Sequence, residues 1–213
     1  MSLPPTTCLA DVLQLRGETG WLSPPLRPMV IAPPVLGTAR TVRLAAGPGG
    51  LGPLRDLLTE DLSGRVIVIA DARHAAGGVW GEILSLAAQG RGAVGALVDG
   101  AVRDLAALGR IGLQVWAGDQ ATAGPGADVH VAEIGGPVTI GSASVADGDP
   151  VLLDAEGAVV LPSRTAADVL AAATAYARAE EEVAAELLAG RDLSEAYRHK
   201  ASVVQRISRS LRS

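Results

Sequence analysis

Short apolar runs rich in Val, Ile and Leu recur along the chain and are bordered by Gly, Pro and acidic residues. Runs of this length and composition are typical of strands. They predict strands at 38–45, 66–70, 94–98, 113–116, 128–133, 137–140, 150–153 and 158–161. Seven prolines before residue 37 predict an extended lead-in, with a short helix only at about 8–16.

Segments of helical pattern lie between the early strands, at 53–62, 80–89 and 104–109. The first half therefore alternates strand and helix, whereas the middle consists mostly of short strands. This mixture predicts a single α/β domain over residues 1–190, with a second sheet layer rather than a pure doubly wound fold.

The last fifty residues differ, because they have helical composition throughout. Thr165-x-x-Asp168 resembles a capping box, and Gly190 is a helix stop, which predicts a helix from Thr165 to Leu188. A second helix is expected at about 193–211. Its apolar residues lie near one face: Val203, Val204, Ile207 and Leu211. This segment, 191–213, is expected to be an amphipathic helix that packs on a neighbouring domain or subunit.

Composition narrows the class of protein. The chain has 213 residues, 48% hydrophobic, with a net charge of −5, and this mild acidity argues against a nucleic-acid partner. The single cysteine, Cys8, excludes an intrachain disulfide and is expected to be a buried apolar residue. We see no signal peptide and no run long enough to span a membrane, so we expect a cytoplasmic protein without a membrane partner.

Two scarce residue types exclude some chemistry. Lysine occurs once, as Lys200 in a charged segment, which is a poor candidate for a Schiff-base nucleophile. The three histidines are widely spaced, so no zinc site is visible. Any metal would be a hard, oxygen-liganded cation such as Mg²⁺ or Mn²⁺.

The stretch GPGGLG, residues 47–52, matches the G-x-G-x-x-G pattern of dinucleotide-binding loops. However, Pro48 and Pro53 remove backbone N–H groups that such a loop needs for pyrophosphate. We therefore interpret it as a glycine turn with Pro53 at the first helical position.

A candidate site begins at GGVWGEILSLAAQGRG, residues 77–92. Its apolar residues recur at helical spacing and predict one buried face: Trp80, Ile83, Leu84, Ala87 and Ala88. Gly81 precedes the first turn, whose free N–H groups near Glu82, Ile83 and Leu84 form a natural cradle for a carboxylate.

The second half of the site follows strand 94–98, where Asp99-Gly100 leads to Arg103-Asp104. Ligands of open α/β sheets bind at the carboxyl ends of the strands, so Glu82 and Asp104 could face one pocket. Two carboxylates can hold a divalent cation, and Arg103 can clamp a substrate carboxylate. A metal beside a bound 2-oxo acid can stabilise an enolate.

Each residue also has a structural interpretation. Glu82 could interact with the helix dipole, Arg103 and Asp104 could be a surface ion pair, and Asp99 could fix an Asp-Gly turn.

The stretch GGVWGEILSLAAQGRGAVGALVDGAVRDL resembles the core of the 4-hydroxy-4-methyl-2-oxoglutarate aldolase family, which includes the RraA-like regulators of ribonuclease activity. The acidic residue, twenty intervening residues and Arg-Asp match Glu82, 83–102 and Arg103-Asp104. The resemblance extends to GTARTVRL (37–44), GRVIVIAD (64–71) and DGDPVLLDAEGAVVLP (147–162).

The resemblance implies a three-layer β/β/α, swivelling-domain-like fold with C-terminal helices, assembled as trimers or hexamers. It implies Mg²⁺- or Mn²⁺-dependent aldol cleavage of a 4-hydroxy-2-oxo acid to pyruvate, with oxaloacetate decarboxylation as a side activity. Asp104 would ligate the metal, Glu82 would hold a metal-bound water, and Arg103 would bind the pyruvate carboxylate. Gly81 and the N–H groups of Ile83 and Leu84 would help to bind substrate.

The resemblance also implies a glutamate from the neighbouring subunit's C-terminal helix, for which Glu180, Glu181 and Glu182 are candidates. The alternative function is that of an RraA-like regulator, which binds an RNA-degrading enzyme and catalyses nothing. The retained Asp104 and the long C-terminal tail favour the enzyme.

Overall fold

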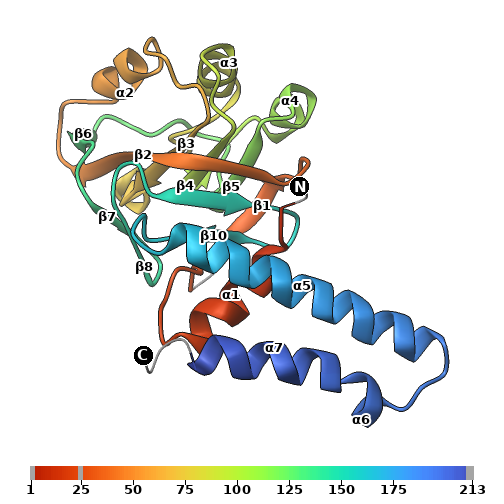
Figure 1. Ribbon diagram of the computed structural model, residues 1–213. Helices are drawn as coiled ribbons and strands as arrows, with labels where there is room; N and C mark the ends of the chain where they lie inside the picture. Colours follow the sequence, from red (N-terminus) through yellow and green to blue (C-terminus); the bar gives the residue numbers. More distant parts are fainter. Residues whose placement is uncertain (1–2, 24–25, 210–213) are drawn as a thin grey trace.

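The computed structural model describes residues 3–23 and 26–209, and its centre is a mixed sheet (Figure 1). The strands lie in the order β1-β5-β4-β3-β2-β9-β10, and β6 pairs with the far end of β2. Strands β2 to β5 are parallel, whereas β1, β6 and β9 pair antiparallel with their neighbours. The strand bounds are β1 Arg27–Val30, β2 Val35–Ala46, β3 Arg65–Ala70, β4 Gly95–Val102, β5 Gln114–Gln120, β6 Val129–Ile134, β7 Val138–Ile140, β8 Ala143–Val145, β9 Pro150–Leu153 and β10 Ala158–Val160.

Strand β3 shows why the sheet is covered on both faces. Ile67 and Ile69 point to one face, and Val66 and Val68 point to the other, and all four side chains are fully buried. Alternate residues of a strand face opposite sides, so a strand apolar at every position needs a cover on each side.

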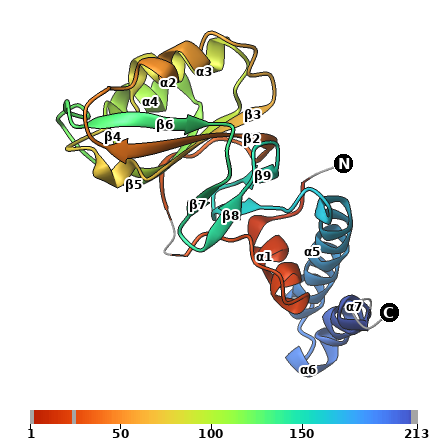
Figure 2. The same ribbon diagram turned by 90° about the vertical axis from the view of Figure 1, so that its left-hand side faces the viewer.

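Three helices form the first cover (Figure 1). They pack with Ile67 and Ile69 in one hydrophobic core. Their bounds are α2 Gly52–Leu57, α3 Glu82–Gly90 and α4 Leu105–Ile111. The sheet curls beyond β2, so that β9 and β10, together with the β7–β8 hairpin, form the second cover and pack with Val66 and Val68 in a second core (Figure 2). The layers are thus helix, sheet and sheet, which confirms the three-layer fold implied by the resemblance.

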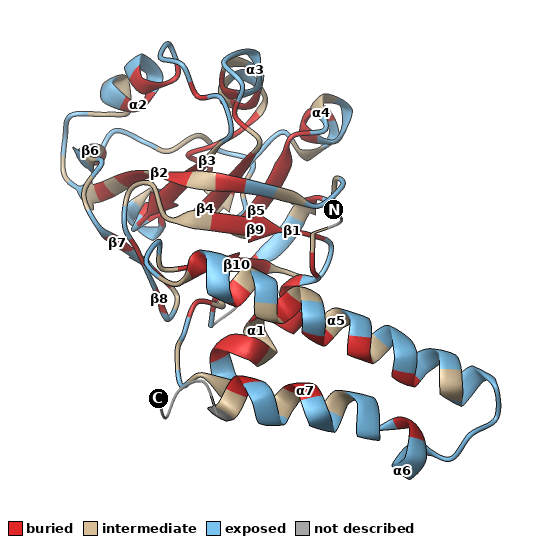
Figure 3. Ribbon diagram, viewed as in Figure 1, coloured by how far each residue is buried: buried red, intermediate tan, exposed pale blue. Residues whose placement is uncertain are grey.

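A helical unit packs against β9 and β10 and combines both ends of the described chain. Its helices are α1 Thr6–Leu15, α5 Ala166–Leu188, α6 Leu193–Ala196 and α7 Arg198–Arg209. Helix α5 projects from the sheet, and α7 returns antiparallel to it (Figure 1). A third core joins α1, α5 and α7 to Leu152, Val159 and Leu161, while the outer sides of α5 and α7 are largely exposed (Figure 3). Val203 and Ile207 are buried in this core, so α7 packs on helices of its own chain.

Several predicted elements needed correction. The lead-in forms strand β1, and β8 was not predicted. Strand β4 does not end before Asp99-Gly100 but continues to Val102, with a register shift between Val98 and Ala101. The predicted helix 53–62 ends at Leu57, and the predicted helix 193–211 is divided into α6 and α7. Leu211 lies outside the described residues.

The predicted capping box is also wrong. Thr165 is the residue before α5, but its side chain caps no helical N–H. Its hydroxyl instead donates to Glu18 Oε2 at 3.2 Å. Gly190 does end the helix as predicted, with a left-handed φ of 82° and its N–H donated to Leu187 O.

Candidate active site

A cleft of about 440 Å³ opens at the carboxyl edge of the parallel strands, beneath α2 and α3. One wall comes from the loop after β2, the floor from residues 78–84, and the other wall from the end of β4. The six residues that the sequence analysis assigned to the site all line this cleft: Gly81, Glu82, Ile83, Leu84, Arg103 and Asp104. Its volume is within the range of sites for small ligands.

Backbone pairing brings the two sequence-distant halves together. Residue Trp80 forms a parallel bridge with Val102 at the end of β4. Val79 N–H donates to Ala101 O at 3.0 Å, and Arg103 N–H donates to Trp80 O at 2.9 Å. The segment before α3 therefore continues the sheet beside β4 and places Gly81 against Arg103 and Asp104.

Asp104 has an unusual backbone for a residue that carries a side chain. Its φ is 61° and its ψ is 37°, in the left-handed region that Asn, Asp and Gly tolerate best. It precedes α4, and its carbonyl accepts the N–H groups of Ala107 and Leu108. Its Oδ2 points toward the start of α3, 3.4 Å from the N–H of Glu82.

Arg103 lies beside this carboxylate, with Nε 3.5 Å from Asp104 Oδ2. Both side chains are more than two-fifths exposed, so the ion pair alone contributes at most about 1 kcal/mol to stability. The first N–H groups of α3 have no acceptor within the helix and face the same cleft. A cation, a carboxylate and a helix N-terminus thus meet at one point.

The predicted apolar face of α3 needs one correction. Trp80 and Ala88 are buried, but Ile83 is 71% exposed and lies at the cleft instead of in the core. The helix begins only at Glu82, so the helical spacing counted from Trp80 does not apply. Ser85 is buried in its place and accepts a hydrogen bond from Trp80 Nε1 at 2.7 Å.

The glycine loop at 47–52 is a turn, as predicted, but α2 begins at Gly52, so Pro53 is the second helical residue and not the first. Gly47 and Gly50 have positive φ, and their N–H groups donate to Asp128 O and Val129 O. These two donors are thus used by residues at the start of β6, and Pro48 and Pro53 have no N–H to offer a pyrophosphate.

Sequence analysis did not identify Arg55. This residue of α2 lines the cleft together with Gly50 and Leu51, on the wall formed by the loop after β2. A lone arginine on a short exposed helix has no signal that distinguishes it from a solvated residue, and only the packing of α2 over the sheet edge places it at the cleft.

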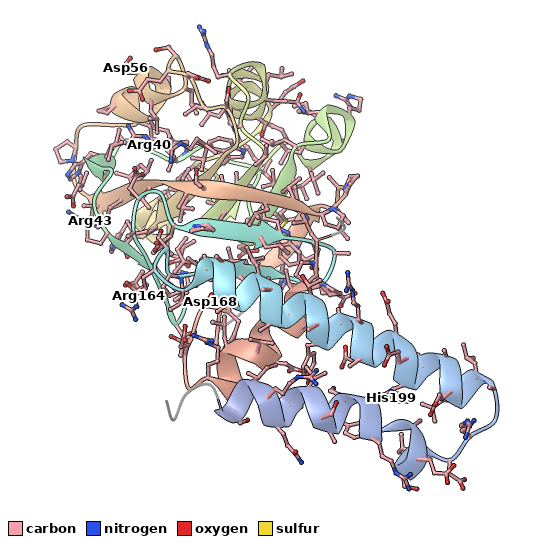
Figure 4. All side chains as sticks on the ribbon, viewed as in Figure 1. Arg40, Arg43, Asp56, Arg164, Asp168 and His199 are labelled. Carbon is pink, nitrogen blue, oxygen red and sulfur yellow. The ribbon has the colours of Figure 1, made fainter. Side chains whose placement is uncertain are left out.

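The three candidate glutamates lie on α5, away from their own chain's cleft. Glu180 Oε1 pairs with Lys200 Nζ at 2.6 Å, and Glu182 Oε2 lies 3.1 Å from His199 Nδ1. His199 lies on α7 (Figure 4). Glu181 is exposed and makes no ion pair with another described residue.

The donor set of the cleft suits a hard cation. Its acidic residues are Glu82 and Asp104, and no histidine or cysteine lines it. Among residues 3–23 and 26–209, no three His, Cys, Asp or Glu side chains gather as a ligand set. Mg²⁺ is typically bound by one or two carboxylates plus several waters, so two acidic residues are sufficient.

No helix in the part of the chain that the structure describes is long and apolar enough to cross a bilayer.

Comparison with known proteins gives three informative relatives. A "Putative 4-hydroxy-4-methyl-2-oxoglutarate aldolase" of Halalkalibacterium halodurans is 30% identical over 166 residues, which is 78% of this chain and 76% of that protein. An uncharacterized protein of Pseudomonas syringae pv. tomato has a TM-score of 0.81 at 25% identity, covering 91% of this chain and 92% of its own.

The third relative is RraAS2 of Streptomyces coelicolor, described as an unusual member of the RNase ES inhibitor RraA family. Its TM-score is 0.73 at 25% identity, covering 82% of this chain and 88% of its own. The RraA-like family, described as Aldolase/RraA, matches residues 6–160. On this match and the aldolase-named relative, the chain belongs to the RraA-like family.

Proposed function

We propose that this protein is a divalent-metal-dependent lyase that cleaves a 4-hydroxy-2-oxo acid, such as 4-hydroxy-4-methyl-2-oxoglutarate, and releases pyruvate. One observation carries the proposal: Glu82, Arg103 and Asp104 line one cleft at the N-terminus of α3. The name of the Halalkalibacterium halodurans relative supports the same reaction.

The residues divide the work as follows. Arg103 and the N–H groups of Ile83 and Leu84 bind the carboxylate next to the keto group. Glu82 accepts the proton of the C4 hydroxyl through a water, and the O–H electron pair becomes the C=O bond of the product that contains C4. The C3–C4 bond breaks, its electron pair forms the enolate of pyruvate, and the proton held by Glu82 and its water returns to C3.

Asp104 would hold Mg²⁺ or Mn²⁺ directly, and Glu82 would hold it through a water. When bound, such a cation polarises the keto oxygen and stabilises the enolate charge. The same binding of a 2-oxo acid explains why oxaloacetate decarboxylation is expected as a side activity.

The experiment measures pyruvate release from 4-hydroxy-4-methyl-2-oxoglutarate, and loss of oxaloacetate, with and without Mg²⁺. We expect turnover that EDTA abolishes and Mg²⁺ restores. Asp104→Asn is the sharper variant, because Asn tolerates the left-handed backbone while the ligand charge is lost. It should lower kcat/KM by roughly 100-fold or more and leave the melting temperature unchanged.

Asp104→Ala should also abolish activity, but it adds backbone strain of about 1 kcal/mol and confounds the two effects. Full activity in Asp104→Asn would refute the metal assignment. No metal-dependent turnover on any 4-hydroxy-2-oxo acid would refute the lyase itself.

The proposal also requires an oligomer, because the family resemblance implies that a glutamate of a neighbouring subunit lines the cleft. Glu180 and Glu182 pair with residues of α7, whereas Glu181 makes no ion pair with another described residue. We therefore propose Glu181 as the glutamate that lines the neighbouring subunit's cleft. Light scattering should then give three or six times the chain mass of 21.5 kDa. A monomer would exclude any contribution from a neighbour.

The alternative is an RraA-like regulator that binds an RNA-degrading enzyme. The likeness to RraAS2 favours it. A pull-down with an RNase E-type enzyme, combined with the turnover assay, separates the two: binding without turnover supports the regulator, and turnover without binding supports the lyase.

A further inference from the structure

The cleft contains a second arginine that the proposed mechanism does not use. Arg55 lines it from α2, on the wall formed by the loop after β2, whereas Arg103 enters from the end of β4. The side chain of Arg55 makes no ion pair or hydrogen bond with another described residue, whereas Arg103 pairs with Asp104. An unpaired guanidinium at a ligand-sized cleft is suited to an anion.

The charges of the lining can be balanced. Its charged side chains are Arg55, Glu82, Arg103 and Asp104, which sum to zero. A divalent cation held by Glu82 and Asp104 offsets their two negative charges and leaves the two arginines uncompensated. The loaded cleft therefore has the charge that a dianion neutralises and that a monoanion leaves half unpaired.

The separate origins of the arginines decide which dianion fits. One carboxylate must lie at Arg103 and the start of α3, next to the reacting keto group. Arg55 approaches from a different element, so its partner is a second carboxylate on the same ligand. A cleft of about 440 Å³ has room for a dicarboxylic acid of five or six carbons in total.

We propose that Arg55 is the residue of this chain that binds the distal carboxylate of the substrate, and that it sets the preference for that substrate over a 2-oxo acid with a single carboxylate. This inference rests on the proposed function for the position of the reacting group.

The test uses two probes that differ only at the distal end. 2-Oxoglutarate and 2-oxovalerate are both five-carbon 2-oxo acids, but only 2-oxoglutarate has a second carboxylate. Calorimetric titration of the full-length protein in Mg²⁺ should show tighter binding of 2-oxoglutarate by about 10-fold or more. Arg55→Met should remove this preference and change 2-oxovalerate binding less than twofold, while Arg55→Lys should keep part of it.

Arg110→Met is the matched control, because Arg110 is exposed on α4 and does not line the cleft. It should bind both probes as the unaltered protein does. Turnover gives a second reading: Arg55→Met should lower kcat/KM for 4-hydroxy-4-methyl-2-oxoglutarate about 10-fold and leave that for 4-hydroxy-4-methyl-2-oxovalerate, which yields pyruvate and acetone, unchanged.

Equal binding of the two probes by the unaltered protein, or an intact preference in Arg55→Met, overturns the assignment of Arg55 while leaving the lyase in place. Absence of pyruvate release from either hydroxy acid overturns the lyase, and the calorimetric comparison still decides the role of Arg55.

Discussion

Gly81 is the residue on which the placement of Asp104 most directly depends. A Cβ at this position would lie 2.7 Å from Asp104 Oδ2 and 3.0 Å from Arg103 Cγ. Gly81→Ala should therefore displace the carboxylate and lower kcat/KM by about 10-fold or more, because small displacements in a site are costly. Steady-state pyruvate release measures the loss.

Gly109→Ala is its counterpart, since a Cβ there would meet no atom within 4 Å. It lies inside α4 and should raise stability by about 0.5–1 kcal/mol with activity unchanged. Equal activity of the two variants would contradict the close fit at Gly81.

At this scale the sequence identified Glu82, Arg103 and Asp104 as charged residues of the cleft, but it did not identify the features that depend on packing. The spacing of Glu82 from Arg103-Asp104 pointed to one site because helix and strand ends meet at a sheet edge. The exposure of Ile83 could not be predicted, because it depends on the residue at which α3 begins. The position of Arg55 at the cleft could not be predicted either, because α2 carries no sequence motif.

Among the elements, α1 depends on a distant carboxylate. Its N-cap is Pro5, which offers no side-chain acceptor. The buried Asp154, from the β9–β10 turn, accepts Thr6 N–H at 2.7 Å and Thr6 Oγ1–H at 2.6 Å, and also bonds its own turn. Asp154→Ala should lower the free energy of unfolding by about 3 kcal/mol, measured by urea denaturation.

Asp168→Ala removes an exposed carboxylate from the first turn of α5 and should cost about 0.5 kcal/mol, the size of a helix-dipole interaction. If Asp154→Ala and Asp168→Ala lowered the free energy of unfolding by similar amounts, the burial and hydrogen bonds of Asp154 would not contribute the extra stability that we expect. If the predicted capping box existed, Asp168 would contribute more to the stability of α5 than this dipole interaction does.

Element prediction succeeded where apolar runs were bounded by turns, as at 66–70 and 150–153. It failed for β1 and β8 because neither contains a run of large apolar residues: β1 reads RPMV and β8 reads ASV. Strand β4 extends beyond its predicted end because its pairing with β5 continues past Asp99-Gly100, with a register shift between Val98 and Ala101.

The described part of the molecule has three hydrophobic cores, and its helical unit holds a partly buried cluster of ionisable side chains: Cys8, Tyr176, Glu180 and Lys200. Burial raises the pKa of the Cys8 thiol to about 12, and its hydrogen bond to Glu180 acts in the same direction. Burial likewise raises the pKa of Tyr176 to about 12. The pKa of Lys200 is raised, despite the opposing effect of burial, by Glu180 and by Tyr176.

These shifts predict instability at alkaline pH. An unfolded thiol loses its proton near pH 9.0, whereas the folded one keeps it to about 12, so the unfolded state gains free energy of ionisation in that interval. The melting temperature should be level between neutral pH and pH 9 and should fall steadily above pH 9. Cys8→Ala should make the decline shallower between pH 9 and 10, and an unchanged slope would contradict the role of the thiol.

At this largest scale, composition and alternation predicted an α/β fold with a second sheet layer. The attachment of α7 to its own chain was beyond prediction, because an amphipathic helix shows that it has an apolar face but not which partner covers it.

The bridge between Trp80 and Val102 has a consequence for how the chain can vary. Their pairing, not the number of residues between Glu82 and Arg103, fixes the separation of the two halves of the site. The twenty-residue interval is the length of one helix, one loop and one strand. Residues inserted at the exposed turn 90–92, where α3 gives way to β4, would lengthen the interval and leave the cleft floor unaltered.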